Sequence, residues 1–265
     1  MIESIILGSI QGIFEWLPIS SQGNLVLLMI GLFKIGAVEA FKYSVFLHLG
    51  TFLAVLVYFR KEIIDILKHL PKYSLGFKDK KSGLISFLVV STLVTVVIGF
   101  PLYRAFSSFS FRGEVFLGLV GLALIVSGLL QRYSHRKKVK EERMLSFRDS
   151  LILGFFQGLA IIPGISRSGI TVSAFLLKRY SPKQSLHLSF LMSIPVLFGG
   201  GIFLPLVDGL PDINIINLFL GLLFSFIFGL ITIKILLELA KKIRFWLFCV
   251  VIGFLAFIPL IIYIL

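Results

Sequence analysis

The sequence predicts an all-α integral membrane protein with about six transmembrane helices and two re-entrant helical hairpins, arranged as two inverted-topology repeats. Three observations support this class: an apolar composition, basic segments that alternate with apolar runs, and two similar polar interruptions in the two halves of the chain. Of 265 residues, 57% are hydrophobic and 15% are charged, and the mean hydropathy is +1.01. Soluble domains usually contain about 25% charged residues. We therefore expect a single membrane domain that spans residues 1–265.

The net charge of +13 is concentrated between the apolar runs. The basic clusters lie within 60–83, 132–148, 178–183 and 241–244. Cytoplasmic loops of membrane proteins carry an excess of Lys and Arg, so we place these clusters on the cytoplasmic face and expect no nucleic acid partner. The remaining loops, 105–112 and 207–213, then lie outside.

Six apolar segments have the roughly 17–25 residues that a crossing needs. They are 41–59, 84–104, 113–131, 184–206, 214–237 and 246–264. Two further segments, 1–33 and about 150–180, are apolar but interrupted by Pro, Gly and Ser. Each must return to the side from which it entered, because a full crossing would place some of the basic clusters outside. We therefore expect one hairpin that enters from outside and one that enters from the cytoplasm.

The two interrupted segments resemble each other, LGSIQGIFEWLPISSQG at 7–23 against LGFFQGLAIIPGISRSG at 153–169. Four residues recur at a constant offset of 146: Gly8, Gln11, Gly12 and Gly23 match Gly154, Gln157, Gly158 and Gly169. Inverted repeats with broken helices are a known membrane architecture. The sequence thus predicts repeat one at about 1–131, a basic cytoplasmic linker at 132–149 and repeat two at about 150–265.

The tips of the two hairpins form the candidate site, because irregular backbone at membrane depth is tolerated only where protein or water satisfies its polar groups. The polar tip residues singled out here are Ser20, Ser21, Asn24, Ser166, Arg167, Ser168 and Thr171. A helix starts after each tip, and its free N–H groups favour an anion such as phosphate. Any one of the serines can equally be a helix cap.

Arg167 and Glu15 are charged residues inside apolar segments, where a charge costs about 2.5–3.5 kcal/mol on insertion scales. Gln11 lies four residues before Glu15 and so shares its helical face. Glu15 has three open roles: it could hold a divalent cation, act as a general base, or pair with Arg167.

Two motifs carry a family resemblance. EWLPISSQGN at 15–24, together with PGISRSGIT at 163–171, closely resembles the signature motifs of the undecaprenyl-pyrophosphate phosphatases, the bacitracin-resistance family. The stretch FLHLGTFLAVLVYFR at 46–60 is similar to that family's next segment. The resemblance implies a multi-pass plasma-membrane phosphatase that removes the terminal phosphate of a polyprenyl diphosphate. Its product would return as a lipid carrier for cell-envelope glycan synthesis, and its site would open to the extracytoplasmic side.

The resemblance also implies roles for individual residues. It points to Glu15, Ser21 and Arg167 as catalytic. From the chemistry of a buried acid beside a diphosphate, we also expect Mg²⁺ or Ca²⁺ as a cofactor, with Glu15 as its ligand. The expected phosphate-binding residues are Gln11, Ser20, Asn24, Ser166, Ser168, Thr171 and His48. Asn24 stands where many members have a histidine, and an amide cannot exchange a proton near neutral pH. A mechanism that needs this histidine would therefore require His48 as its substitute.

Two alternatives stay open at this point. The serine could attack phosphorus, or Glu15 could orient a water for direct hydrolysis. A transporter or flippase of polyprenyl phosphate would suit the same architecture, whereas a purely structural protein would leave Glu15 and Arg167 unexplained. The sequence leaves the oligomeric state undetermined, with a homodimer as one option.

Overall fold

The computed structural model is helical throughout the part of the chain that it describes, with no strand there. The described residues are 1–17, 19–73, 76–77, 79–108, 113–134, 144–162, 164–203, 205–206, 209–239, 245–255 and 261. The first-half elements are α1 (Ile2–Phe14), α2 (Ser21–Gly31), α3 (Ala37–Tyr58), α4 (Arg60–His69), η1 (Leu70–Lys72), α5 (Lys80–Ser108) and α6 (Gly113–Ser134). The second-half elements are α7 (Phe147–Leu159), α8 (Arg167–Leu177), α9 (Pro182–Phe198), the π-helix η2 (Gly199–Phe203), α11 (Ile215–Leu239) and α12 (Phe245–Leu255).

Four helical stretches in the described part are long and apolar enough to cross a bilayer. They are Ala37–Tyr58, Lys80–Ala105, Pro182–Phe203 and Ile215–Glu238. They overlap four of the six predicted spans, so the prediction of an all-α, multi-pass membrane protein is confirmed. The other two predicted spans, 113–131 and 246–264, fall on α6 and α12, and the second of them extends beyond the described residues.

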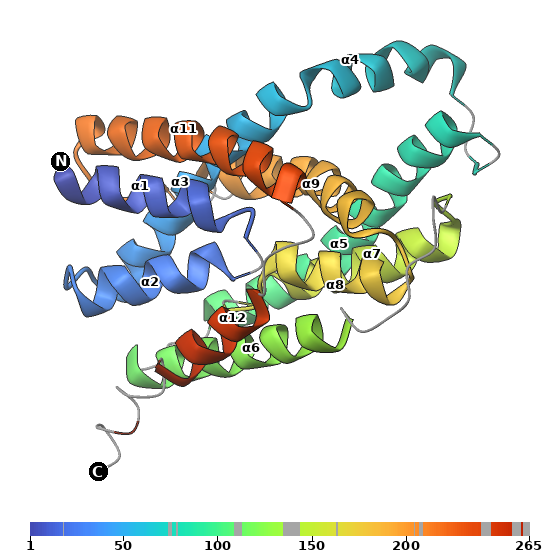
Figure 1. Ribbon diagram of the computed structural model, residues 1–265. Helices are drawn as coiled ribbons and strands as arrows, with labels where there is room; N and C mark the ends of the chain where they lie inside the picture. Colours follow the sequence, from blue (N-terminus) through green and yellow to red (C-terminus); the bar gives the residue numbers. More distant parts are fainter. Residues whose placement is uncertain are drawn as a thin grey trace.

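Two short helical hairpins lie at the positions of the two interrupted segments (Figure 1). In the first, α1 contacts α2, and in the second, α7 contacts α8. Helices of 11 to 13 residues are about 17–20 Å long at 1.5 Å per residue, shorter than the roughly 30 Å hydrocarbon core. The prolines of the two tips, Pro18 and Pro163, lie outside the described residues.

Each hairpin packs its first helix against a long helix of the other half of the chain: α1 lies against α11, and α7 lies against α5. Glycines on α1 and α7 make both approaches close. A Cβ at Gly12 would lie 2.6 Å from the carbonyl oxygen of Ser225, and one at Gly154 would lie 2.6 Å from that of Ser91. Small residues at these contacts let the helix backbones meet, as is common in membrane helix packing.

The basic 60–83 segment, interpreted from sequence as a loop, contains the helix α4. Figure 1 shows α4 running on from α3 and away from the bundle before α5 returns. Asp79 precedes α5 and accepts hydrogen bonds from the backbone N–H groups of Ser82 (2.9 Å) and Lys81 (3.0 Å). The bond from Ser82 is the main reason that the pKa of Asp79 lies below its usual value. This capping fixes the residue at which α5 begins.

Candidate active site

A small cavity of about 50 Å³ lies between the tips of the two hairpins and the middle of α3. Its lining is mostly polar and comprises Glu15, Ser20, Ser21, Gln22, His48, Ala160, Ile165, Ser166, Arg167 and Ser168. Both hairpin tips therefore contribute to one polar cavity inside an otherwise apolar helical protein.

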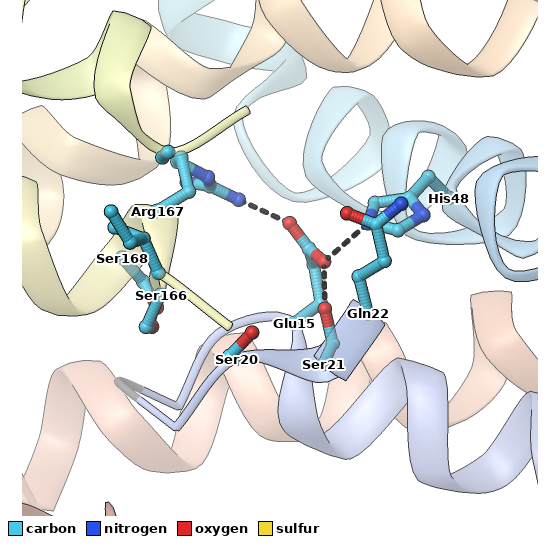
Figure 2. Close-up of a pocket in the computed structure, with 10 residues that line it drawn as sticks. Glu15, Ser20, Ser21, Gln22, His48, Ser166, Arg167 and Ser168 are labelled. Atoms are coloured by element: carbon cyan, nitrogen blue, oxygen red, sulfur yellow. Dashed lines mark hydrogen bonds and ion pairs between the residues drawn. The ribbon is translucent and has the colours of Figure 1, made fainter. Parts of the chain in front are cut away.

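Glu15 lies at the centre of this cavity, between Arg167 on one side and Ser21 and His48 on the other (Figure 2). Its side chain is only 4% exposed. Oε2 accepts hydrogen bonds from the Ser21 hydroxyl at 2.7 Å and from Gln11 Nε2 at 3.0 Å. These two donors and the Arg167 guanidinium satisfy the Glu15 carboxylate, which would otherwise be costly to bury.

Arg167 is the first residue of α8 and reaches across to the other hairpin. Its NH2 atom lies 2.5 Å from Oε1 of Glu15, and its side chain is 11% exposed. NH1 donates to the backbone carbonyl of Ser189 on α9 at 3.4 Å, and the guanidinium lies 5.5 Å from the centre of the Trp16 ring. Its planar group is thus held between a carboxylate and an aromatic face, with N–H donors that a phosphate could share.

His48 approaches Glu15 from α3. Its Nε2 lies 3.2 Å from Oε2 of Glu15, and its Nδ1 lies 2.7 Å from the carbonyl oxygen of Ser44. A carbonyl can only accept, so Nδ1 carries a hydrogen. The carboxylate oxygen is also an acceptor when ionised. The contact between Nε2 and Oε2 therefore needs a proton of its own, and the Glu15–His48 pair can hold and release one.

The two helix N-termini at the cavity are capped in the same way. The Ser20 hydroxyl accepts from the backbone N–H of Gly23 at 3.4 Å, and the Ser166 hydroxyl accepts from that of Gly169 at 3.0 Å. Ser20 has a φ of +59°, a region that residues other than glycine seldom adopt. The capping role of both serines is therefore real, and it coexists with their place in the cavity lining.

A second hydrogen bond joins the two tips, besides the one from Arg167 to Glu15: the Ser168 hydroxyl donates to the backbone carbonyl of Leu17 at 2.8 Å. Ser168 also lies 3.3 Å from the hydroxyl of Ser166. These contacts fix the separation of the two hairpins at the point where both helices begin, so the positive ends of α2 and α8 face a common space.

Seven predicted site residues line the cavity, and three others support it from behind. Gln11 contacts Glu15 as described. The Thr171 hydroxyl donates to the Arg167 carbonyl at 2.7 Å and lies 2.7 Å from the Ser189 hydroxyl. The Asn24 amide donates to the backbone carbonyls of Ile19 (2.7 Å) and Ser20 (2.9 Å), so it holds the turn before α2 and does not line the cavity.

Three residues with a part in the site were missed from the sequence: Gln22, Trp16 and Ser189. Gln22 lines the cavity within the first signature motif, so its position was available as a signal. Trp16 adjoins Glu15 in the chain, and an aromatic ring beside a buried cation was foreseeable. Ser189 lies inside a long apolar helix, and nothing in its sequence context distinguishes it from other buried serines.

Glu15 is the one carboxylate in the cavity lining that a divalent cation could use. Within the described part of the chain, no group of three or more His, Cys, Asp and Glu side chains comes together. Mg²⁺ is usually bound through one or two carboxylates and completes its shell with water and substrate phosphates. Glu15 supplies one carboxylate, with the Ser20 and Ser21 hydroxyls in the same cavity lining. These three side chains would complete the coordination shell of a divalent cation only together with phosphate oxygens and water.

Comparison with known proteins identifies similar sequences over nearly the whole chain. The family described as bacitracin resistance protein BacA matches residues 4–258. A protein of Methanococcoides burtonii named undecaprenyl-diphosphatase is 43% identical over 257 residues, 96% of each chain. Proteins of the same name from Haloarcula marismortui and Methanothrix thermoacetophila are 36% and 35% identical, over 96% and 95% of this chain and 94% of each relative.

Proposed function

Because this chain belongs to the BacA bacitracin-resistance family, we propose that it is a membrane undecaprenyl-diphosphatase. It hydrolyses an undecaprenyl-type diphosphate to the monophosphate and inorganic phosphate, and so recycles the lipid carrier. Relatives that carry the name undecaprenyl-diphosphatase align over nearly its full length. The structural observation that carries the proposal is the buried Glu15–Arg167 pair between two helix N-termini.

Substrate binding begins with Arg167. The terminal phosphate competes with the Glu15 carboxylate for the guanidinium, which can bind two phosphate oxygens at once. The N-termini of α2 and α8 add donors and the positive ends of two helix dipoles. Preorganised donors of this kind stabilise the charge that develops on the transferred phosphoryl group, which is the main source of catalysis in phosphoryl transfer.

The attacking group is Ser21 or a water molecule. In the first route, the Ser21 hydroxyl passes its proton to Glu15 Oε2, its hydrogen-bond partner at 2.7 Å. Ser21 Oγ then bonds to the terminal phosphorus, the bridging P–O bond breaks, and polyprenyl monophosphate leaves. Water hydrolyses the phosphoserine in a second step. In the second route, Glu15 takes the proton of a water that attacks the terminal phosphorus directly, the bridging P–O bond breaks, and polyprenyl monophosphate and inorganic phosphate are released.

His48 is the proton carrier that we assign to both routes. It contacts the Glu15 oxygen that also contacts Ser21, so a proton taken from the nucleophile can be shared with the imidazole. In the serine route the pair passes the proton from Ser21 to the departing monophosphate, and in the second half it can then take the proton of the hydrolytic water. General acid–base groups of this kind contribute typically 100- to 10,000-fold to the rate.

The cofactor that we propose is Mg²⁺ or Ca²⁺, with Glu15 as its protein ligand. When bound, the cation would neutralise diphosphate charge and polarise the phosphoryl oxygens. Arg167, the two helix N-termini and the Ser20 and Ser166 hydroxyls orient the phosphate around it.

The topology that we propose consists of six spans and two re-entrant hairpins in two inverted repeats, joined by the cytoplasmic linker 132–149. Two features support it: the reciprocal packing of α1 on α11 and of α7 on α5, and the two serine caps at equivalent places. We place the protein in the plasma membrane with the site open to the extracytoplasmic side, because the basic segments are expected on the cytoplasmic face. A homodimer remains a prediction.

The transporter alternative is not favoured, because the relatives described above carry the name of a diphosphatase. Phosphate release by the purified protein in detergent tests the choice, because hydrolysis needs no second compartment. The substrates are C55 and shorter prenyl diphosphates, with Mg²⁺, Ca²⁺ or EDTA. We expect release by the wild type, at least a 100-fold loss in Glu15→Gln and in Arg167→Ala, and loss of activity in EDTA.

The matched control for Glu15→Gln is Asp149→Asn, which neutralises another buried acid, located at the start of α7. This variant should retain activity on a per-folded-protein basis. If monodisperse wild type released no phosphate with any chain length or cation, the phosphatase assignment would be wrong, and lipid translocation in liposomes would be measured next.

A further inference from the structure

A second concave site lies away from the hairpin tips, between the ends of α3 and α11. It is a groove of about 440 Å³, lined by Val57, Tyr58, Arg60, Leu230, Ile231 and Lys234. None of these residues lines the catalytic cavity. The groove is therefore a separate feature of the surface, and the phosphatase mechanism makes no use of it.

The groove combines an apolar wall with two cations. Val57 is 41% exposed and Ile231 is 48% exposed, as expected of side chains that face lipid. Arg60 and Lys234 are exposed, and the Arg60 guanidinium uses NH1 to donate to the Val57 carbonyl at 2.9 Å. No ion pair between described residues involves either cation. Their charge is thus available to an external anion.

The acidic side chains nearest in sequence are engaged or lie outside the groove. Glu62 contacts His187 at 3.0 Å and Asp65 contacts Lys81 at 2.9 Å. Glu238 lies one turn beyond Lys234 on α11 and is not part of the lining. The lining itself contains no acid, so its formal charge is that of its two cations.

Both cations lie at the basic end of the helical bundle. Arg60 begins the basic 60–83 segment, and Lys234 lies two turns before the basic residues at 241–244. Under the positive-inside rule, this end meets the cytoplasmic surface of the membrane, where anionic lipids attract Lys and Arg. The groove therefore has its cations at headgroup level and its apolar wall toward the acyl chains.

We propose that this groove binds an anionic bilayer phospholipid. The lipid phosphate lies between the Arg60 guanidinium and the Lys234 ammonium, and an acyl chain runs along Val57, Leu230 and Ile231. A soluble phosphate ester would leave that apolar wall uncovered, which is why the occupant is a lipid. Arg60 serves this role better than a lysine would, because its planar fork can bind two oxygens of one phosphate.

Native mass spectrometry of protein released from mixed phosphatidylcholine and phosphatidylglycerol nanodiscs tests the proposal. The double variant Arg60→Gln/Lys234→Gln is compared with Lys61→Gln/Lys80→Gln, which removes the same charge from exposed residues that do not line the groove. We expect wild type and control to retain phosphatidylglycerol, and the groove variant to bind it about thirtyfold more weakly, as for two cations near a membrane surface.

The proposal would be overturned if the two double variants both retained phosphatidylglycerol as the wild type does, or if both lost it to the same extent. Retention by wild type of added polyprenyl monophosphate in place of phosphatidylglycerol would also overturn it, since the groove would then be a carrier-lipid site. Folding of each variant is checked by monodispersity and by its melting temperature in detergent. Phosphate release from a solubilised prenyl diphosphate is a separate readout, so failure of the phosphatase assignment leaves this test intact.

Discussion

Arg167 NH2 and Glu15 Oε1 lie 2.5 Å apart although their residues are separated by 152 positions in the chain. Each comes from a different hairpin, and both side chains are largely buried. The pair therefore joins the two hairpins and supplies opposite charges at one point of the cavity. Either residue without the other would be a charge lacking its ion-pair partner inside an apolar protein, so each stabilises the other.

The first prediction concerns the energetic coupling of this pair. We expect Arg167→Met to destabilise the protein by about 3–5 kcal/mol, because it leaves the Glu15 carboxylate buried without its cation. The double variant Arg167→Met/Glu15→Gln should be more stable than Arg167→Met. Unfolding midpoints of the wild type, both single variants and the double variant form a double-mutant cycle. Strictly additive effects would contradict a direct interaction.

The second prediction separates the two routes of hydrolysis. If Ser21 is the nucleophile, Ser21→Ala abolishes turnover, and rapid acid quench of the wild type traps a phosphoserine. The comparison variant is Ser20→Ala, which removes the neighbouring hydroxyl and the Gly23 cap and should reduce activity without abolishing it. Substantial turnover by Ser21→Ala, with no trapped phosphoenzyme, would favour direct attack by water.

The third prediction assigns proton transfer to His48. We expect His48→Gln to lower kcat by about 100- to 10,000-fold and to remove one limb of the pH–rate profile, because the glutamine cannot exchange a proton. His187→Gln is the control, since His187 contacts Glu62 on α4 and lies outside the cavity lining. An unchanged profile in His48→Gln would show that Glu15 works without this partner.

The fourth prediction tests the close packing of the hairpins. In Gly154→Ala the new methyl would lie 2.6 Å from the Ser91 carbonyl oxygen and 2.8 Å from the Val94 Cβ. We expect a loss of stability of about 1–3 kcal/mol, typical of overpacking, and a lower melting temperature in detergent. Gly31→Ala is the control, because nothing lies within 4 Å of a Cβ placed there. Equal melting temperatures for the two variants would contradict the packing argument.

Much of the site was predictable because charges and broken helices are rare in membranes. A lone acid and a lone arginine in apolar segments made a contact with Arg167 one of the three roles expected of Glu15, and the absence of a histidine at Asn24 directed attention to His48. The structure brings these side chains together, while their catalytic and binding roles stay predictions. Helix capping, the alternative role weighed for the serines, is seen for Ser20 and Ser166, whose hydroxyls accept from the backbone N–H groups of Gly23 and Gly169.

Other features depend on tertiary contacts or on chemistry that a local pattern does not carry. Asn24 occupies a position that the family motif associates with catalysis, yet its amide satisfies the carbonyls of Ile19 and Ser20. The Ser20 carbonyl also accepts from the backbone N–H of Asn24 at 3.1 Å, so the amide adds a second donor there, beside a left-handed backbone conformation at Ser20 that a sequence does not reveal. The involvement of Ser189 depends on how α9 approaches Arg167, and such an approach is set by the packing of the whole bundle.

The fold was predicted well in its apolar parts and less well in its basic ones. Long apolar segments identified four membrane helices within a few residues. The helix α4 was missed because its lysines were interpreted as a sign of a loop. Ile64 and Leu67 are three residues apart, which is the spacing of apolar residues on one face of a helix. An amphipathic segment at a membrane surface satisfies both patterns, so charge alone could not distinguish loop from helix.

The packing of α1 on α11 has a consequence for how this protein is made. Gly12 meets Ser225, so α1 contacts a helix that the ribosome produces about 200 residues later. During synthesis α1 is made before its packing partner α11, and Glu15 is made before Arg167. Until both partners are inserted, the first hairpin lies beside the translocon or in lipid with the Glu15 carboxylate unpaired with Arg167. Membrane insertion and tertiary assembly are thus separate events here, and the unassembled N-terminal hairpin is the intermediate on which quality-control proteases would act.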